Sequence, residues 1–214
     1  MVKKRDIYRV FRGHGVPTRL YLGIKLRICP VRRVETSVPP QGKVVDLGCG
    51  SGLMAVLFML GSERRQVVGF DLDPKKVQAA RRLKDRWPTL EFHEADLIAL
   101  HVPDAQAVTI VDVLYLIPYA QQEEILKRCF EALSPGGVLV LKDMDTRPRW
   151  KYAWNYFQET LAVKMLGFTL GSSFYFRSRD NYRRILEGLG FKVEIVPLDK
   201  HYWYPHILFL CRKP

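Results

Sequence analysis

The chain has 214 residues, of which 48% are hydrophobic and 26% are charged, and its formal net charge at pH 7 is +12. This length and balance suit one globular core that folds without disulfides. No apolar run is long enough to span a bilayer, and the cysteines show no C-x-x-C or metal-ligand spacing. We therefore predict no transmembrane helix, no disulfide framework and no metal site, and we expect a cytoplasmic location.

The first 40 residues are predicted to form a separate basic segment. Residues 1–35 contain ten basic side chains against two acidic ones, Asp6 and Glu35, and so carry a formal charge of +8. Leu and Ile alternate with other residues between Leu20 and Ile28, which suits a strand, but the flanking prolines favour a helix. The excess of cations indicates either a surface for an anionic partner (RNA, lipid headgroups or an acidic carrier protein) or a solvated helix face.

From residue 41 onward, short apolar runs alternate with amphipathic ones. The predicted strands are 44–47, 67–71, 90–95, 107–113, 138–141, 191–196 and 207–211. The predicted helices are 53–60, 74–86, 121–133, 149–166 and 179–189, and Asp73 with Pro74 forms a helix start. This alternation predicts that residues 41–214 form an α/β domain, a three-layer sandwich with helices on both faces of a mostly parallel sheet. Ligands bind where the carboxyl ends of such strands meet.

The stretch VVDLGCGSG, residues 44–52, has three glycines at alternate positions after a buried strand. Glycines there let a ligand approach the backbone closely. A dinucleotide-binding turn would have a further glycine at Leu53, and Asp46 would repel a pyrophosphate. A cationic group is therefore expected near Asp46, while Asp71, at the end of the second strand, can accept hydrogen bonds from ribose hydroxyls. S-adenosylmethionine combines these groups.

Together with VVGFDLDP, HEADL, VTIVDVLYLIP and LSPGGVLVL, this stretch resembles the class I S-adenosylmethionine-dependent methyltransferases over residues 40–145. The resemblance implies seven strands in the order 3-2-1-4-5-7-6, with strand 7 antiparallel. It implies S-adenosylmethionine as cofactor and S-adenosylhomocysteine as product. It also implies that Asp71 binds the ribose, that Leu72 and Leu97 contact the adenine, and that Asp96 lies near its amino group. The implied cofactor residues are Asp46, Gly48, Cys49, Gly50, Gly52, Asp71, Leu72, Asp96, Leu97 and Asp112, the last facing the methionine and the reacting methyl group.

Aromatic residues surround the expected acceptor side. Methyl transfer from a sulfonium chiefly requires alignment, and a base only where the acceptor is weakly acidic. His14, between two glycines, is the first candidate for a base and His201 the second; a surface or capping role is the alternative for each. An apolar or aromatic small acceptor, free or carrier-bound, suits such walls, although part of the aromatic set suits an ordinary helix core. The predicted acceptor residues are Tyr8, Tyr115, Tyr119, Trp150 and Trp154.

Three other functions stay open at this point. The basic N-terminal segment suits an RNA methyltransferase, although Asp112-Val113-Leu114-Tyr115 stands where base-amino methyltransferases have Asn/Asp-Pro-Pro-aromatic. A membrane-peripheral, lipid-modifying methyltransferase would use the same segment on anionic lipid, and a binding module without catalysis would use it too. The methyl acceptor, the use of a base and the choice between monomer and homodimer are left open.

Overall fold

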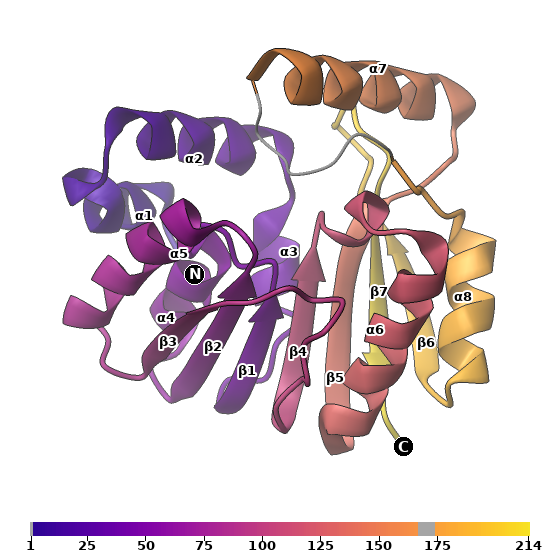
Figure 1. Ribbon diagram of the computed structural model, residues 1–214, viewed down its shortest axis with the longest axis horizontal. Coiled ribbons are helices and arrows are strands. Elements are labelled where there is room, and N and C mark those ends of the chain that lie inside the picture. Colours follow the sequence, from indigo (N-terminus) through magenta and orange to yellow (C-terminus); the bar gives the residue numbers. More distant parts are fainter. Residues whose placement is uncertain (1, 167–173) are drawn as a thin grey trace.

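The computed structural model describes residues 2–166 and 174–214, except for the side chains of residues 159–166. Its strands form one sheet in the order β3-β2-β1-β4-β5-β7-β6, with parallel pairing from β3 through β5 and antiparallel pairing of β7 with both β5 and β6. The predicted strand order and the antiparallel seventh strand are confirmed (Figure 1). The strands are β1 Gly42–Leu47, β2 Arg65–Asp71, β3 Leu90–Glu94, β4 Ala105–Val111, β5 Leu133–Met144, β6 Lys192–Pro197 and β7 His206–Arg212.

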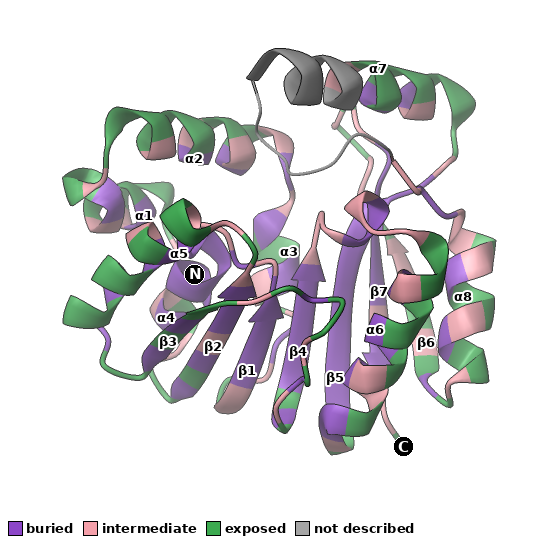
Figure 2. Ribbon diagram, in the orientation of Figure 1, coloured by how far each residue is buried: buried purple, intermediate pink, exposed green. Residues whose placement is uncertain are grey.

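Helices cover both faces of the sheet and complete the three predicted layers. Neighbouring strand residues enter different cores: Val44 belongs to the cluster shared with α4 and α5, and Val45 to the cluster shared with α6 and α8. Both faces of the central strands are therefore buried (Figure 2), which explains their almost continuous apolar sequence. The helices are α1 Lys4–Val10, α2 Val16–Ile28, α3 Val31–Glu35, α4 Leu53–Gly61, α5 Pro74–Arg81, α6 Tyr119–Ala132, α7 Arg149–Leu166 and α8 Arg179–Gly188, with short 3-10 turns at Phe11–Gly13, Arg82–Asp85 and Leu114–Leu116.

Two elements, α5 and β5, have a boundary that differs from the sequence prediction by more than two residues. Helix α5 ends at Arg81 and continues as the 3-10 turn, although its Asp73 cap accepts hydrogen bonds from two backbone N–H groups as expected. Strand β5 is far longer than residues 138–141. The Ser-Pro-Gly-Gly stretch after α6 was expected to be a loop, but Leu133 pairs with Ala105 before a bulge, so this stretch lies within the strand.

The basic N-terminal segment contains three helices. Residues 16–28 form helix α2, as the flanking prolines indicated, and it buries Leu22 and Leu26. The buried Arg65 of β2 anchors the stretch 35–39 that precedes β1. Its guanidinium donates to the carbonyls of Val38 and Pro39 and pairs with Glu35. Helices α2 and α7 both lie beyond the carboxyl ends of the parallel strands (Figure 1). Within the described residues, no helix is both long and apolar enough to cross a membrane.

Candidate functional site

The glycine loop joins β1 to α4 at the carboxyl edge of the sheet. Gly48, Gly50 and Gly52 all have positive φ values, of 79°, 54° and 84°, which other residues adopt only with strain. The N–H groups of Gly48 and Cys49 donate to the Phe70 carbonyl, at 2.7 and 2.9 Å. A Cβ at Gly48 would overlap the Val113 side chain, whereas one at Gly50 would have no atom of the described residues within 4 Å. The loop is therefore held against β2 and is open beside Gly50.

Asp46 lies buried in β1, two residues before Gly48, and only one of its carboxylate oxygens is hydrogen-bonded among the described residues. Its Oδ1 accepts a hydrogen bond from the Thr109 hydroxyl at 2.6 Å, while its buried Oδ2 has no partner within the described part of the chain. Burial raises the pKa of Asp46 to about 7, although the Thr109 hydrogen bond opposes that rise. A buried acceptor without a donor is costly. An ammonium group of a ligand would supply the missing donor and favour the ionised carboxylate.

Asp71 connects the end of β2 to the glycine loop. Its Oδ2 accepts from the Gly50 N–H at 2.8 Å and its Oδ1 from the Asp73 N–H at 3.0 Å. Each carboxylate oxygen retains a further lone pair, so ribose hydroxyls can still donate to it. Leu72, the next residue, is 48% exposed and is therefore free to contact a ligand. These residues fit a nucleoside that carries an ammonium group.

The other predicted cofactor residues differ in how accessible they are. Asp96 is exposed after β3 and its Oδ1 accepts from the Ile98 N–H at 2.9 Å. Leu97 is buried in the same cluster as Phe70. Cys49 is buried with its side chain against Gly69, and burial raises the pKa of its thiol. Cys49 thus contributes packing and backbone groups rather than a reactive thiolate. The adenine contacts of Asp96 and Leu97 stay predictions.

A charged cluster that the sequence did not reveal surrounds Asp112. Asp112 follows β4 with φ of 57°, and its carboxylate pairs with Lys25 of α2 at one oxygen and Lys142 of β5 at the other. The Cys29 thiol lies 3.6 Å from the same carboxylate. Burial alone would raise the pKa of Asp112, but the two lysines hold it well below its usual range. The α2 helix is thereby tied to the strand ends through Lys25.

His206 lies at the start of β7, close to this cluster. Its Nε2 lies 2.6 Å from the Ile28 carbonyl oxygen, so that nitrogen carries the proton, and none of the residues that the structure describes pairs with its buried Nδ1. Burial and the charge of Lys142 lower the pKa of His206 to about 3. The imidazole is therefore neutral at pH 7. The sequence analysis did not single out Lys142, but its position directly after the apolar run 138–141 is a signal that could have found this region. The Lys142 side chain is fully buried.

Tyr115 and Tyr119, two predicted acceptor residues, meet around the segment that precedes α8. The Tyr115 ring stacks on Phe176, with centroids 4.8 Å apart and planes 11° apart. Tyr119 donates its hydroxyl to the Phe176 carbonyl at 3.1 Å. Phe176 also contacts Tyr152 of α7 edge to face, at 5.6 Å. The turn after β4 and helix α7 are thus joined by one aromatic cluster.

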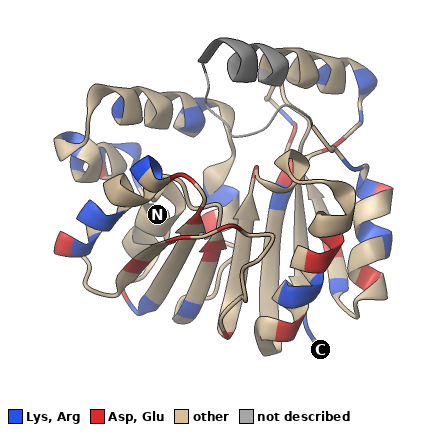
Figure 3. Ribbon diagram, viewed as in Figure 1, with Lys and Arg blue, Asp and Glu red and all other residues tan. Residues whose placement is uncertain are grey.

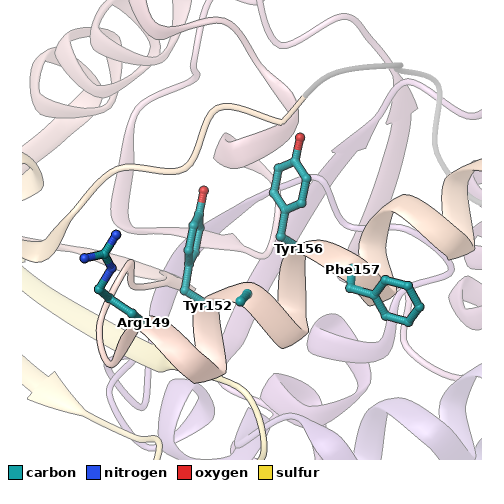
Figure 4. A pocket seen from close by; sticks show the side chains of 5 residues that line it. Arg149, Tyr152, Tyr156 and Phe157 are labelled. Atoms are coloured by element: carbon teal, nitrogen blue, oxygen red, sulfur yellow. The ribbon is translucent and has the colours of Figure 1, made fainter.

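A pocket of about 590 Å³ lies along α7. The side chains of Tyr152 and Tyr156 project to the same side of the helix (Figure 4). Neither tyrosine belongs to the predicted acceptor set, which includes Trp150 and Trp154 of the same helix. The pocket is lined by Arg149, Tyr152, Ala153, Tyr156 and Phe157.

Trp150 and Trp154, which were predicted to contact the acceptor, do not line that pocket. They are 58% and 41% exposed. Trp154 lies 6.4 Å from Trp203, measured between ring centroids. Trp150 lines a second hollow, of about 350 Å³, together with Lys151, His201, Tyr202 and Trp203.

The remaining predicted residues lie apart from one another. Tyr8, on α1, is 45% exposed, and its hydroxyl lies beside Gly23 of α2. The Nε2 of His14 lies 3.0 Å from the Ala79 carbonyl oxygen of α5. His201 is exposed beside Trp203, in the loop before β7. The two candidate bases therefore belong to different parts of the molecule, and their catalytic role stays a prediction.

Known proteins resemble the chain in sequence and in fold. Residues 44–137 match the sequence model of a family described as a methyltransferase domain. Trans-aconitate 2-methyltransferase of Paracidovorax citrulli is 36% identical over 127 residues, covering 56% of this chain and 46% of that protein. N,N-dimethyltransferase OxyT of Streptomyces rimosus is 29% identical over 164 residues, covering 76% and 46%.

Among solved structures, a chain of the complex between the Haloferax volcanii Trm112 methyltransferase activator and the putative methyltransferase has a TM-score of 0.72 at 19% identity. That match covers 90% of this chain and 92% of that one. At this identity the match is evidence for the fold. The chain spans about half the length of the curated relatives it matches. The sheet order, the glycine loop with its two carboxylates and the match of residues 44–137 to a methyltransferase domain thus agree in making the chain similar to the class I S-adenosylmethionine-dependent methyltransferases.

Proposed function

We propose that this chain transfers the methyl group of S-adenosylmethionine to a small apolar or aromatic acceptor, either free or bound to a carrier. The observation that carries the proposal is the buried Oδ2 of Asp46, which has no hydrogen-bond partner among the described residues and belongs to the residue two positions before Gly48. In this proposal Asp46 holds the ammonium group of the cofactor, and Asp71 accepts hydrogen bonds from its ribose. When bound, the cofactor supplies an electrophilic methyl group on a sulfonium.

The acceptor class is drawn from the pocket along α7. Tyr152, Tyr156 and Phe157 give it mainly aromatic walls, and Arg149 adds one cation at its end. Such walls bind a planar apolar body, and a few polar groups orient it. The names of the relatives refer to different acceptors. These names therefore do not indicate which acceptor this chain uses.

The protein's part in the reaction is alignment and exclusion of water. A sulfonium is already a good leaving group, so orientation of the acceptor contributes most of the rate. His206 is neutral, its Nδ1 is buried, and it does not line the pocket along α7. With a pKa of about 3 it is a weak base.

The affinity for S-adenosylmethionine is expected to depend on pH through Asp46. The apo carboxyl has a pKa of about 7, and only its ionised form pairs with an ammonium. Below about pH 7 the dissociation constant should therefore rise about tenfold per pH unit, because binding must release a proton. The Asp46→Asn variant should lose this slope. Calorimetric titrations of both proteins from about pH 5.5 to about pH 8 measure it, and equal slopes would contradict the role of Asp46.

Transfer of labelled methyl from S-adenosylmethionine into cell extract tests the proposed function. The products are separated into RNA, protein, lipid and small-molecule fractions, and protein-bound label is released by hydrolysis to detect a carrier. Label in the small-molecule or carrier fraction supports the proposal. Label confined to RNA supports the RNA alternative, and label confined to lipid supports the lipid-modifying one. Absence of transfer in every fraction, from a protein that binds the cofactor, contradicts the catalytic role.

A further inference from the structure

Helix α2 exposes a row of apolar side chains on the face opposite its buried one. Val16, Leu20 and Ile24 are 74%, 64% and 50% exposed, and their four-residue spacing puts them on one face. Leu22 and Leu26 face the core instead. The row therefore contributes nothing to the core that the structure describes. An apolar helix face of this kind in contact with solvent marks an interaction surface.

A second exposed apolar group lies on α7 and in the loop before β7. Trp154, Phe157 and Trp203 are 41%, 60% and 69% exposed. The Trp154 ring lies 6.3 Å from Phe157 and 6.4 Å from Trp203, so the three form one patch. Trp150, one turn before Trp154, is also exposed. Three of the chain's four tryptophans thus lie here, and the fourth, Trp87, is buried.

Basic side chains predominate around both groups, although Arg147 pairs with Asp180 and Lys151 pairs with Asp199. Residues 11–34 contain six Lys or Arg and no Asp or Glu, and residues 146–158 contain three and none. Arg12, Arg19, Arg27, Arg147 and Arg149 are exposed. Basic side chains occur along α2 and at the start of α7 (Figure 3), and both helices lie beyond the carboxyl ends of the strands (Figure 1).

We propose that the exposed row of α2 and the aromatic patch of α7 and Trp203 together form a docking surface for an anionic lipid bilayer. Tryptophan favours the boundary between headgroups and acyl chains, and Leu and Ile insert just below it. Arginines beside them bind the anionic headgroups. The candidate site at the strand ends then lies on the membrane-facing side of the protein. This inference concerns a partner and does not depend on which acceptor is methylated.

The same observations disfavour two other occupants. A second copy of the chain, related by a twofold axis, would set this basic surface against itself and bring like charges together. An RNA strand would use the arginines and could stack bases on Trp154 and Trp203. It would give no role to the aliphatic row of Val16, Leu20 and Ile24. A bilayer would contact all three features: the arginines, the exposed tryptophans and the aliphatic row.

Vesicle binding by the full chain tests the docking surface. We expect the protein to sediment with vesicles of phosphatidylcholine containing about 30% phosphatidylglycerol, and much less with phosphatidylcholine alone. Tryptophan emission should shift to the blue on binding, because three exposed tryptophans enter the interface. The double variant Leu20→Ser/Ile24→Ser and the variant Trp203→Ser should each partition about tenfold less. Ile98→Ser, which changes a 43% exposed residue after β3, is the matched control and should bind as the wild type does.

Binding of S-adenosylmethionine by every variant shows that it is folded. The proposal is overturned if the wild type does not sediment with anionic vesicles, or if Ile98→Ser weakens binding as much as the surface variants do. Light scattering that shows a dimer dissociated by Leu20→Ser/Ile24→Ser would overturn it in favour of a second copy. RNA binding that is lost in the same variants, without vesicle binding, would overturn it in favour of RNA.

Discussion

Replacement of Asp112 by alanine is expected to lower the free energy of unfolding by about 3–5 kcal/mol, because it leaves Lys142 as a buried cation without its partner. The Lys142 side chain has no exposure and that of Asp112 has 6%. For a chain of this size the loss corresponds to a fall in melting temperature of roughly 6–20 °C. Because the pKa of Asp112 is held well below its usual range, its contribution is present above about pH 4 and is lost on acidification.

A double variant separates the ion pair from other effects of the substitution. Asp112→Ala/Lys142→Met removes the unpaired cation and should recover part of the lost stability, whereas Asp104→Ala, at an exposed acid before β4, should change it little. Denaturant unfolding followed by circular dichroism gives all the values. A loss from Asp112→Ala no larger than that from Asp104→Ala would contradict the buried ion pair.

Gly48→Ala and Gly50→Ala should differ in their principal effect, although both residues have positive φ. Gly48→Ala should mainly lower stability, and Gly50→Ala should mainly weaken binding of the cofactor. Both substitutions carry the cost of a left-handed backbone, about 1–2 kcal/mol. At Gly48 the added Cβ also overlaps Val113, and overpacking adds about 1–3 kcal/mol. Gly48→Ala should therefore be the less stable protein, by thermal unfolding.

Gly50→Ala should fold but bind S-adenosylmethionine at least about tenfold more weakly than the wild type, because its Cβ projects into the open space beside the loop where the cofactor is expected. Fluorescence or calorimetric titration of the folded variant measures this. Wild-type affinity in Gly50→Ala would show that the open side of the loop does not face the cofactor.

The sheet could be predicted from the sequence because its strands are short apolar runs separated by clear helix starts and glycine turns. The run 44–47 and the cap at Asp73 both reflect local chemistry, and the structure agrees with them. The strand order came from the family resemblance. Strand β5 was predicted too short because a Ser-Pro-Gly-Gly stretch locally favours a turn, and pairing of Leu133 with Ala105 overrides that preference.

The candidate site was only partly accessible to sequence reasoning. Asp46 and Asp71 lie at the carboxyl ends of two strands that pair directly, so their proximity to the glycine loop could be expected. The contact of Lys25 with Asp112 joins residues 87 positions apart. This contact depends on where α2 packs against the rest of the protein, and no local sequence pattern predicts that position. Trp154 does not line the α7 pocket because it lies on another face of α7. Which face of α7 is exposed to solvent likewise depends on how the helix packs.

The most direct test of the account is a calorimetric titration of S-adenosylmethionine into the wild type, Asp71→Ala and the control Asp104→Ala at about pH 8. The loop geometry predicts binding by the wild type and the control. Asp71→Ala should bind about ten- to a hundredfold more weakly, since it loses both the ribose hydrogen bonds and the hold on Gly50. Failure of the wild type to bind S-adenosylmethionine, or equal affinity in Asp71→Ala, would contradict the assignment of residues 46–52 and Asp71 as the cofactor site.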